Sequence, residues 1–381
     1  MESKSKRIEQ AGLLKLYEML LCLCIIIFPI INSLKDYYIF GLAPHIIIII
    51  VFFVVGILLE LFSKKRKQQY YASMIIMLAF AAEVAFQTYK GRPSDFGLVL
   101  SVLLYISLLR MPEGISSPKV ICSFYIATII AAIFTVKQGY VDESVSRTAT
   151  MVDGSVSVIA LILIFWFKED FTVTSMYKIL KAVALLAVAI VAGFGMSRAR
   201  LAIMGVFSMI RLIQALSKVG KTKKFNAYII VGAFGIAIIL FFAFRLSITQ
   251  KLLSEILVRF ESGFQSTYRD QEVLFGWDLF MKSPIWGNGW GTIYFYNFLG
   301  RSSFYYNHSM YVAIFARGGI LMAIPMFYSF YLLSKTALKS KNTFAIMALI
   351  GFFALAYGNA GVFNFTICSF TIPIVYSLNK C

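Results

Sequence analysis

The sequence contains few charged side chains. Only 14% of its 381 residues are Asp, Glu, Lys or Arg, whereas about 25% is usual in soluble domains. Apolar residues make up 60% of the chain, and the mean hydropathy is +0.80. This composition excludes a soluble enzyme and is typical of a protein whose main solvent is lipid.

Cysteine and histidine are also scarce. The chain has five cysteines and two histidines, and none of the cysteines falls in a segment that we predict to lie outside the membrane on the outer side. A disulfide framework is therefore not expected. The spacing of these residues is not that of metal ligands. We predict no metal site and no cofactor.

Acidic residues are half as frequent as basic ones, 18 against 36, so the formal charge is +18. In a soluble protein such an excess would indicate nucleic acid, but here the basic residues stand between long apolar runs, where they orient membrane helices. No nucleic-acid partner is predicted. Apolar stretches of about 20 residues, the length that crosses a bilayer, number about twelve. They lie near residues 14–31, 38–62, 70–89, 95–110, 120–136, 151–167, 177–195, 200–216, 226–248, 308–333, 343–359 and 362–378.

The basic residues divide unequally between the two sides of the membrane. The first predicted span follows Lys4, Lys6 and Arg7 and has no cleavage site of the A-x-A type, so we interpret it as a retained anchor with a cytoplasmic N-terminus. Alternating spans then place 22 of the 36 basic and 7 of the 18 acidic residues inside, together with the C-terminus. About +15 of the charge is therefore an orientation signal.

One predicted outer connection is much longer than the others. It covers residues 249–307, between predicted helices over 1–248 and predicted helices over 308–381, and all three parts belong to one membrane domain. A long loop between membrane helices is usually functional. Apolar residues at helical spacing predict two short amphipathic helices on the outer membrane surface, over 252–260 and over 273–280.

A glycine-rich segment follows these two stretches. Residues 282–291 read Lys-Ser-Pro-Ile-Trp-Gly-Asn-Gly-Trp-Gly, a composition that can hold backbone close to another surface. Because no strand precedes it, the segment is not a dinucleotide-binding motif. The composition favours a structural turn.

Two groups of residues are candidates for chemistry at the outer face. His308 stands where the chain re-enters the membrane; it could activate or position an acceptor hydroxyl, or it could only satisfy a helix N-terminus. Arg198 and Arg200 lie in a short outer connection, against the positive-inside trend. They could clamp a pyrophosphate or could snorkel at a helix end.

Further arginines recur near the same face. Arg317 lies inside the tenth predicted span beside two glycines, where an ionisable group usually faces the bundle interior. Arg147 could be only a solvated charge. The remaining outer arginines of interest are Arg269 and Arg301. Their convergence on one membrane face indicates an anionic, lipid-linked ligand handled at the outer leaflet.

Three segments resemble motifs of the bacterial O-antigen polymerases (Wzy) and O-antigen ligases (WaaL). Residues 195–209 resemble the S-R-G/A-x-x-L pattern that opens a helix in that family, with alanine instead of glycine at Ala199. Tyr268-Arg269, a later tryptophan and the 282–291 turn resemble its long periplasmic loop. His308-Ser309, with nine residues to Gly319, is similar to its H-(N/S/Q)-x9-G signature, although Met322 stands where the family tends to carry a small or hydroxyl residue.

The resemblance implies an all-α polytopic membrane enzyme, a metal-independent inverting glycosyltransferase of the GT-C type. Its donor is expected to be an oligosaccharide on undecaprenyl pyrophosphate in the bacterial inner membrane, and its site to face the periplasm. Arg198, Arg200 and Arg269 would hold the pyrophosphate and steady the leaving group, helped by Arg147, Arg301 and Arg317. His308 would activate or position the acceptor hydroxyl, and His308 and Arg269 would be the catalytic residues. We predict an O-antigen polymerase, with a chain-length regulator protein as a partner. The alternatives are a ligase that uses lipid A-core as acceptor and a flippase of lipid-linked oligosaccharide.

Overall fold

The computed structural model describes a set of segments that together carry most of the predicted helices. The described residues are 2–27, 44–62, 68–89, 96–112, 115–141, 155–168, 171–195, 198–219, 267–289, 295–298, 301–304, 309–358, 372, 374 and 375. The predicted span at 226–248, the predicted helix at 252–260, nearly all of the span at 362–378, Arg147 and His308 lie outside them.

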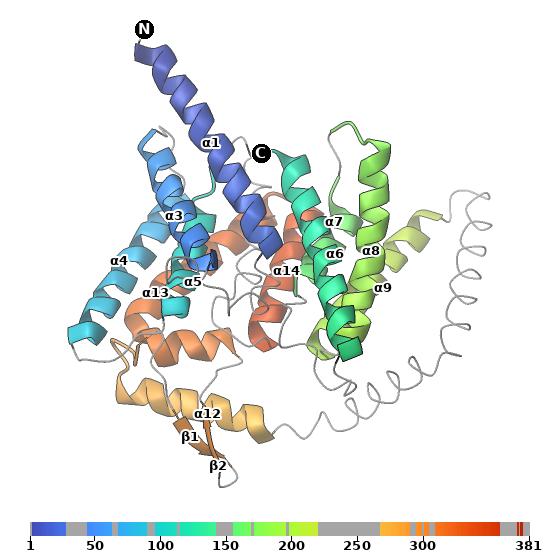
Figure 1. The fold of residues 1–381 in the computed structure, drawn as a ribbon. Coiled ribbons are helices and arrows are strands. Elements are labelled where there is room, and N and C mark those ends of the chain that lie inside the picture. Colours follow the sequence, from blue (N-terminus) through green and yellow to red (C-terminus); the bar gives the residue numbers. More distant parts are fainter. Residues whose placement is uncertain are drawn as a thin grey trace.

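The described segments are helical, with one short hairpin (Figure 1). The helices are α1 (Glu2–Ile27), α3 (Pro44–Phe62), α4 (Gln68–Tyr89), α5 (Phe96–Leu109), α6 (Ser117–Val141), α7 (Ser155–Trp166), α8 (Ser175–Gly195), α9 (Arg198–Val219), α12 (Thr267–Lys282), α13 (Met310–Lys339) and α14 (Thr343–Gly358). Strands β1 (Phe295–Phe298) and β2 (Arg301–Phe304) pair antiparallel, with Phe295 opposite Phe304. The hairpin is an element that the sequence did not predict.

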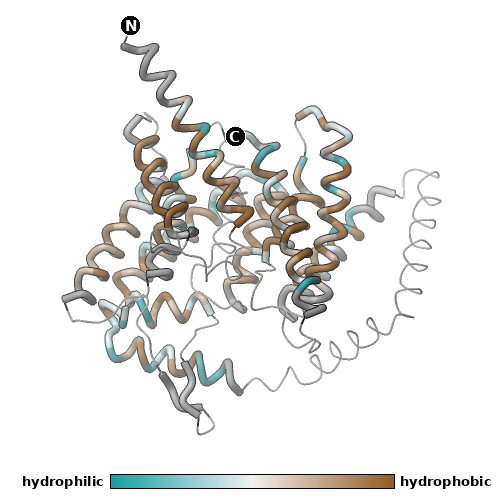
Figure 2. The backbone as a smooth tube through the Cα atoms, in the orientation of Figure 1, coloured by the Kyte–Doolittle hydropathy of each residue, from teal (hydrophilic) through white to brown (hydrophobic). Residues whose placement is uncertain are grey.

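Ten of the twelve predicted spans coincide with a described helix. Three stretches within the described residues are long and apolar enough to cross a membrane, namely Pro118–Lys137, Ser175–Ala192 and Met310–Lys339. Other helices are apolar but shorter, such as Ser155–Trp166 and Thr343–Ala356. Figure 2 shows hydrophobic residues along much of α3, α4 and α8. The chain is therefore a helical protein with transmembrane character, and the number of spans stays a prediction.

The apolar core accommodates its polar side chains by pairing them with protein groups. Tyr105 and Ser329 join α5 to α13 through a buried hydroxyl–hydroxyl hydrogen bond of 2.9 Å. The Tyr17 hydroxyl of α1 donates to the Ser107 carbonyl over 3.2 Å. Thr128 and Thr135 of α6 donate to carbonyls four residues earlier, over 2.8 and 2.7 Å. A polar group in a water-poor environment needs such a partner, so these bonds let the helices pack without a hydration shell.

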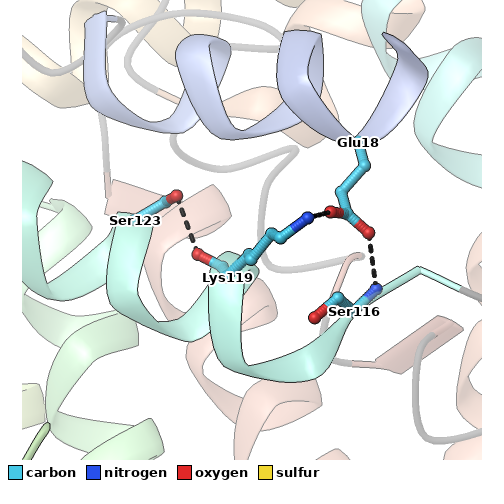
Figure 3. Close-up of polar contacts among 4 residues, drawn as sticks. All are labelled: Glu18, Ser116, Lys119 and Ser123. Carbon is cyan, nitrogen blue, oxygen red and sulfur yellow. Dashed lines mark hydrogen bonds and ion pairs between the residues drawn. The ribbon is translucent and has the colours of Figure 1, made fainter. Parts of the chain in front are cut away.

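An ion pair ties α1 to the start of α6 (Figure 3). The Glu18 carboxylate accepts from the Lys119 ammonium at 2.5 Å and from the Ser116 backbone N–H at 2.8 Å. Ser116 directly precedes α6, so the carboxylate also lies at the positive end of the helix dipole. The sequence predicts Glu18 and Lys119 on the same side of the membrane, and their direct contact satisfies that requirement.

We expect Glu18→Ala to lower the free energy of unfolding more than Lys119→Ala does. The Glu18 side chain is only 10% exposed and holds a backbone N–H, so its loss should cost about 1–3 kcal/mol. The Lys119 side chain is 66% exposed, so water replaces its contribution. Thermal unfolding of both variants in detergent checks the order, and equal shifts of the midpoint would contradict it.

Candidate functional site

The serine-arginine motif lies at a helix boundary. Helix α8 ends at Gly195 and α9 begins at Arg198, so Arg198 and Arg200 occupy the first turn of α9. The prediction that this motif opens a helix is confirmed. The first turn of a helix presents backbone N–H groups and a positive partial charge, which favour an anion. The positions of both arginine side chains lie outside the described part of the structure.

The second predicted amphipathic stretch is also helical. It forms α12, and Arg269 is the third residue of that helix. One face of α12 is buried, with Glu272 at 1% and Leu279 at 2% exposure. Arg269 therefore sits in the first turn, at the end of the helix remote from the glycine-rich segment.

Helix α13 begins one residue after Ser309, which directly follows His308 in sequence. Ser309 is buried and has extended backbone angles, and its carbonyl accepts the first helical hydrogen bond, from Ala313 N–H at 3.1 Å. The Ser309 side chain makes no capping bond. His308 itself, the predicted acceptor-activating residue, lies outside the described residues.

Helix α13 is broken at Gly319. This glycine has φ 59° and ψ −164°, values that no regular helix contains. The two halves of α13 consequently run in different directions (Figure 1). A break of this kind frees carbonyls at the end of the first half and N–H groups at the start of the second. In lipid such groups need protein partners or a water-filled cavity.

The glycine-rich turn supplies those partners. Asn288 and Gly289 donate their N–H groups to the carbonyls of Ala316 and Arg317, over 3.2 and 3.0 Å. In return, the N–H groups of Ile320 and Leu321 donate to the carbonyls of Pro284 and Ile285, over 2.8 and 3.1 Å. The turn thus replaces the missing helical hydrogen bonds on both sides of the break. The prediction of a structural turn is confirmed.

Two side chains strengthen this junction. The Asn288 amide donates from Nδ2 to the Leu279 carbonyl, at the end of α12, and to the Ala316 carbonyl at 2.9 Å. Arg317, only 5% exposed, donates from Nη1 to the Gly289 carbonyl at 3.3 Å. Sequence reasoning proposed Arg317 for a pyrophosphate; the structure adds a contact with the turn that it did not anticipate. Asn288 was not among the predicted residues, and its signal was its position between two glycines.

Two glycines make the close approach of backbones sterically feasible. Gly287 has φ +70°, and a Cβ atom on it would overlap the carbonyl oxygen of Arg317. A Cβ on Gly319 would lie 2.5 Å from the Gly287 nitrogen and from the Ile285 oxygen. Both positions therefore require glycine for two reasons: the backbone has a positive φ, and the contact leaves no room for a side chain. The nine residues between Ser309 and Gly319 form the first half of α13, so this spacing sets its length.

Asn288→Asp should destabilise the protein more than Asn288→Ala. Alanine removes two hydrogen bonds, a loss of about 1–3 kcal/mol. Aspartate instead directs a carboxylate at two carbonyl oxygens in a buried position, which adds repulsion to the lost bonds. Thermal unfolding in detergent measures both variants. A smaller loss for aspartate than for alanine would contradict the assignment of the amide nitrogen.

The junction aligns α12 with the first half of α13. Phe315 packs on both Trp277 and Phe280 of α12, with ring centroids 5.6 and 5.5 Å apart. The two helices lie side by side, and the turn joins the end of α12 to the break that ends the first half of α13 (Figure 1). Because they end together, they also begin on the same side. The first turn of α12, with Arg269, and the Ser309 cap of α13 are thus at one end of the pair.

The other predicted arginines belong to neighbouring elements. Arg301 is the first residue of β2, and the β1–β2 hairpin packs against α12 through β1. Arg269, Arg301 and Arg317 therefore belong to one unit made of α12, the hairpin and α13. Arg198 opens α9, and α14 contacts both α9 and α13. Helix α12 and the hairpin lie at the end of the molecule opposite the N-terminus of α1 (Figure 1).

Comparison with known proteins adds no relative. No protein-family model matches the chain, and no curated protein matches its sequence significantly.

Proposed function

We propose that this protein is a glycosyltransferase of the O-antigen polymerase (Wzy) type. It transfers a glycan from undecaprenyl pyrophosphate to the terminal sugar of a lipid-linked repeat unit. One observation carries the proposal: the turn in the break of α13 holds α12 and the first half of α13 side by side, so that Arg269 and the residue after His308 stand at the same end. Glycosyl transfer needs a pyrophosphate-binding group and a proton acceptor on the same side of the protein, which this arrangement allows.

The chemistry assigns a role to each group. Arg269, with Arg198 and Arg200 of α9, binds the pyrophosphate oxygens, because guanidinium groups match phosphate oxygens in pairs and stay charged when partly desolvated. His308 takes the proton of the acceptor hydroxyl as that oxygen attacks the anomeric carbon. The bond from this carbon to the pyrophosphate oxygen breaks, and undecaprenyl pyrophosphate leaves with the electron pair. Attack from the opposite face inverts the anomeric centre. Arg147 and Arg301 are assigned as further phosphate contacts. Arg317 contributes by holding the turn through its hydrogen bond to the Gly289 carbonyl.

The proposal also sets a location. Twelve spans, both termini in the cytoplasm and a site facing the periplasm of the bacterial inner membrane agree with the distribution of lysine and arginine. A separate chain-length regulator protein is the proposed partner.

Two alternatives are distinguishable from the polymerase. The ligase uses the same donor but hands the glycan to lipid A-core. The break in α13 favours a transferase over a flippase. In transporters the ends of such broken helices contact the substrate, whereas here Ala316, Arg317, Ile320 and Leu321 pair with the protein's own turn.

Reconstitution into proteoliposomes with undecaprenyl-pyrophosphate-linked repeat units tests the proposal. Elongation to a ladder of products without lipid A-core is the expected result. Transfer only when lipid A-core is added would replace the polymerase with the ligase. Movement of the lipid-linked repeat across the bilayer without any new glycosidic bond would replace both with a flippase.

A further inference from the structure

The surface of α12 has three distinct faces. Glu272 and Leu279 lie on the buried face, against α13. The exposed polar or charged positions are Asp270, Gln271, Asp278 and Lys282, and Asp270 lies one helical turn before Leu274. Leu274, Trp277 and Met281, at spacings of three and four residues, form a separate apolar stripe with exposed fractions of 56%, 40% and 73%. Beyond its first turn, which carries Asp270, the helix thus exposes one apolar and one charged face side by side.

The apolar stripe does not stop at the end of α12. Ile285 and Trp286 of the turn are exposed at 60% and 38%. The hydrogen bonds from Ile320 and Leu321 to the turn place this segment directly beside the second half of α13. That half carries its own exposed apolar stripe at helical spacing, formed by Ile320, Ile324, Tyr328 and Tyr331.

The second half of α13 identifies what covers this surface. It belongs to a stretch that is long and apolar enough to cross a membrane, so its exposed stripe faces hydrocarbon. The stripe on α12 and the turn lies next to it, because Met281 and Ile285 are four residues apart and the Ile285 carbonyl accepts from Leu321, the neighbour of Ile320. Tryptophan is enriched in proteins at the boundary between hydrocarbon and headgroups. Trp277 and Trp286 are both exposed on this surface.

We propose that α12 and the 283–289 turn are half inserted in the membrane, parallel to its plane, with acyl chains of the leaflet on that side covering the apolar stripe. The charged face, with Asp278 and Lys282, points to the headgroups and water. Arg269 at the start of α12 then stands at the depth of lipid phosphates. The proposal depends only on the exposure and continuity of the stripe, and it holds whether the protein is a polymerase, a ligase or a flippase.

Fluorescence quenching in vesicles of brominated phosphatidylcholine tests the insertion. The chain has four tryptophans, and replacing Trp166, Trp286 and Trp290 with phenylalanine leaves Trp277 as the reporter. A matched control moves the reporter by one position, with Trp277→Phe and Asp278→Trp in the same background. Bromine on the acyl chains should remove more than half of the emission of Trp277 and much less of that of the control. Similar, weak quenching of both would overturn the proposal.

A second measurement keeps the wild-type tryptophans, because Trp166 donates to Gln214 and its replacement could disturb folding. Photo-reactive p-benzoylphenylalanine is introduced at position 281 or, as a control, at position 278, in the full chain within native membranes. Adducts with phospholipid from position 281 but not from 278 support the insertion. A dimer band would instead show a second copy on the stripe, and adducts with another protein would show a partner there; either would overturn the proposal.

Discussion

Gly287→Ala is expected to release the 283–289 turn from α13 and to destabilise the protein severely. The backbone at position 287 is left-handed, a conformation that costs about 1–2 kcal/mol for alanine. The new methyl group would also overlap the carbonyl oxygen of Arg317, and the obstacle is backbone that cannot rotate away. Strain and lost hydrogen bonds together should lower the free energy of unfolding by about 3–5 kcal/mol. Gly319→Ala should behave similarly.

Limited trypsin digestion of proteoliposomes measures this release. Lys282 is the last residue of α12 and is exposed, so cleavage there should accelerate when the turn leaves the break. Gly205→Ala is the matched control, because a Cβ on Gly205 of α9 meets nothing within 4 Å. The control should digest like wild type and unfold at the same or a slightly higher temperature. Wild-type digestion of Gly287→Ala would show that the turn does not hold the loop.

The second large effect is expected on catalysis alone. His308→Ala should reduce glycan transfer by about 10²–10⁴-fold, the usual contribution of a positioned general base. Arg269→Ala should cost about 10²–10³-fold, because the leaving pyrophosphate loses a charged partner as its bond breaks. Arg269→Lys keeps the charge without the paired geometry and should retain intermediate activity. Both alanine variants should keep the wild-type thermal unfolding profile.

Transfer is measured as the ladder of products from lipid-linked repeat units in proteoliposomes. Lys282→Ala is the control, since it removes a positive charge from the opposite, exposed end of α12. It should give a normal ladder. Near-normal ladders from both His308→Ala and Arg269→Ala would refute the proposed site, even if the protein proved to be a glycosyltransferase.

The helices were predictable because the signals for them are local. Runs of apolar residues in α3, α6 and α8 are visible without any knowledge of their neighbours, and the amphipathic spacing of α12 could be read from the same pattern. The length of each helix was less accessible. Helix α13 reaches Lys339, beyond the apolar stretch predicted over 308–333, because a helix can continue past the residues that lipid requires.

The sequence indicated the two parts of the junction but not their contact. The sequence showed a glycine-rich turn suited to close backbone contact, and it showed Arg317 beside two glycines in an apolar span. Nothing in either pattern indicated that Gly287 and Gly319 face each other, because backbone hydrogen bonds carry no signature in the side chains. The β1–β2 hairpin was missed for a related reason: its second strand, Arg-Ser-Ser-Phe, has little strand propensity.

The break in α13 has a consequence for how the protein is made. A regular helix pairs its own backbone groups and can enter lipid as soon as it leaves the insertion machinery, but the N–H groups of Ile320 and Leu321 need the carbonyls of Pro284 and Ile285 first. The turn precedes α13 in the chain and is synthesised before it. Residues 283–289 must therefore be in place when α13 arrives, and the turn serves as an assembly template for the helix that follows it.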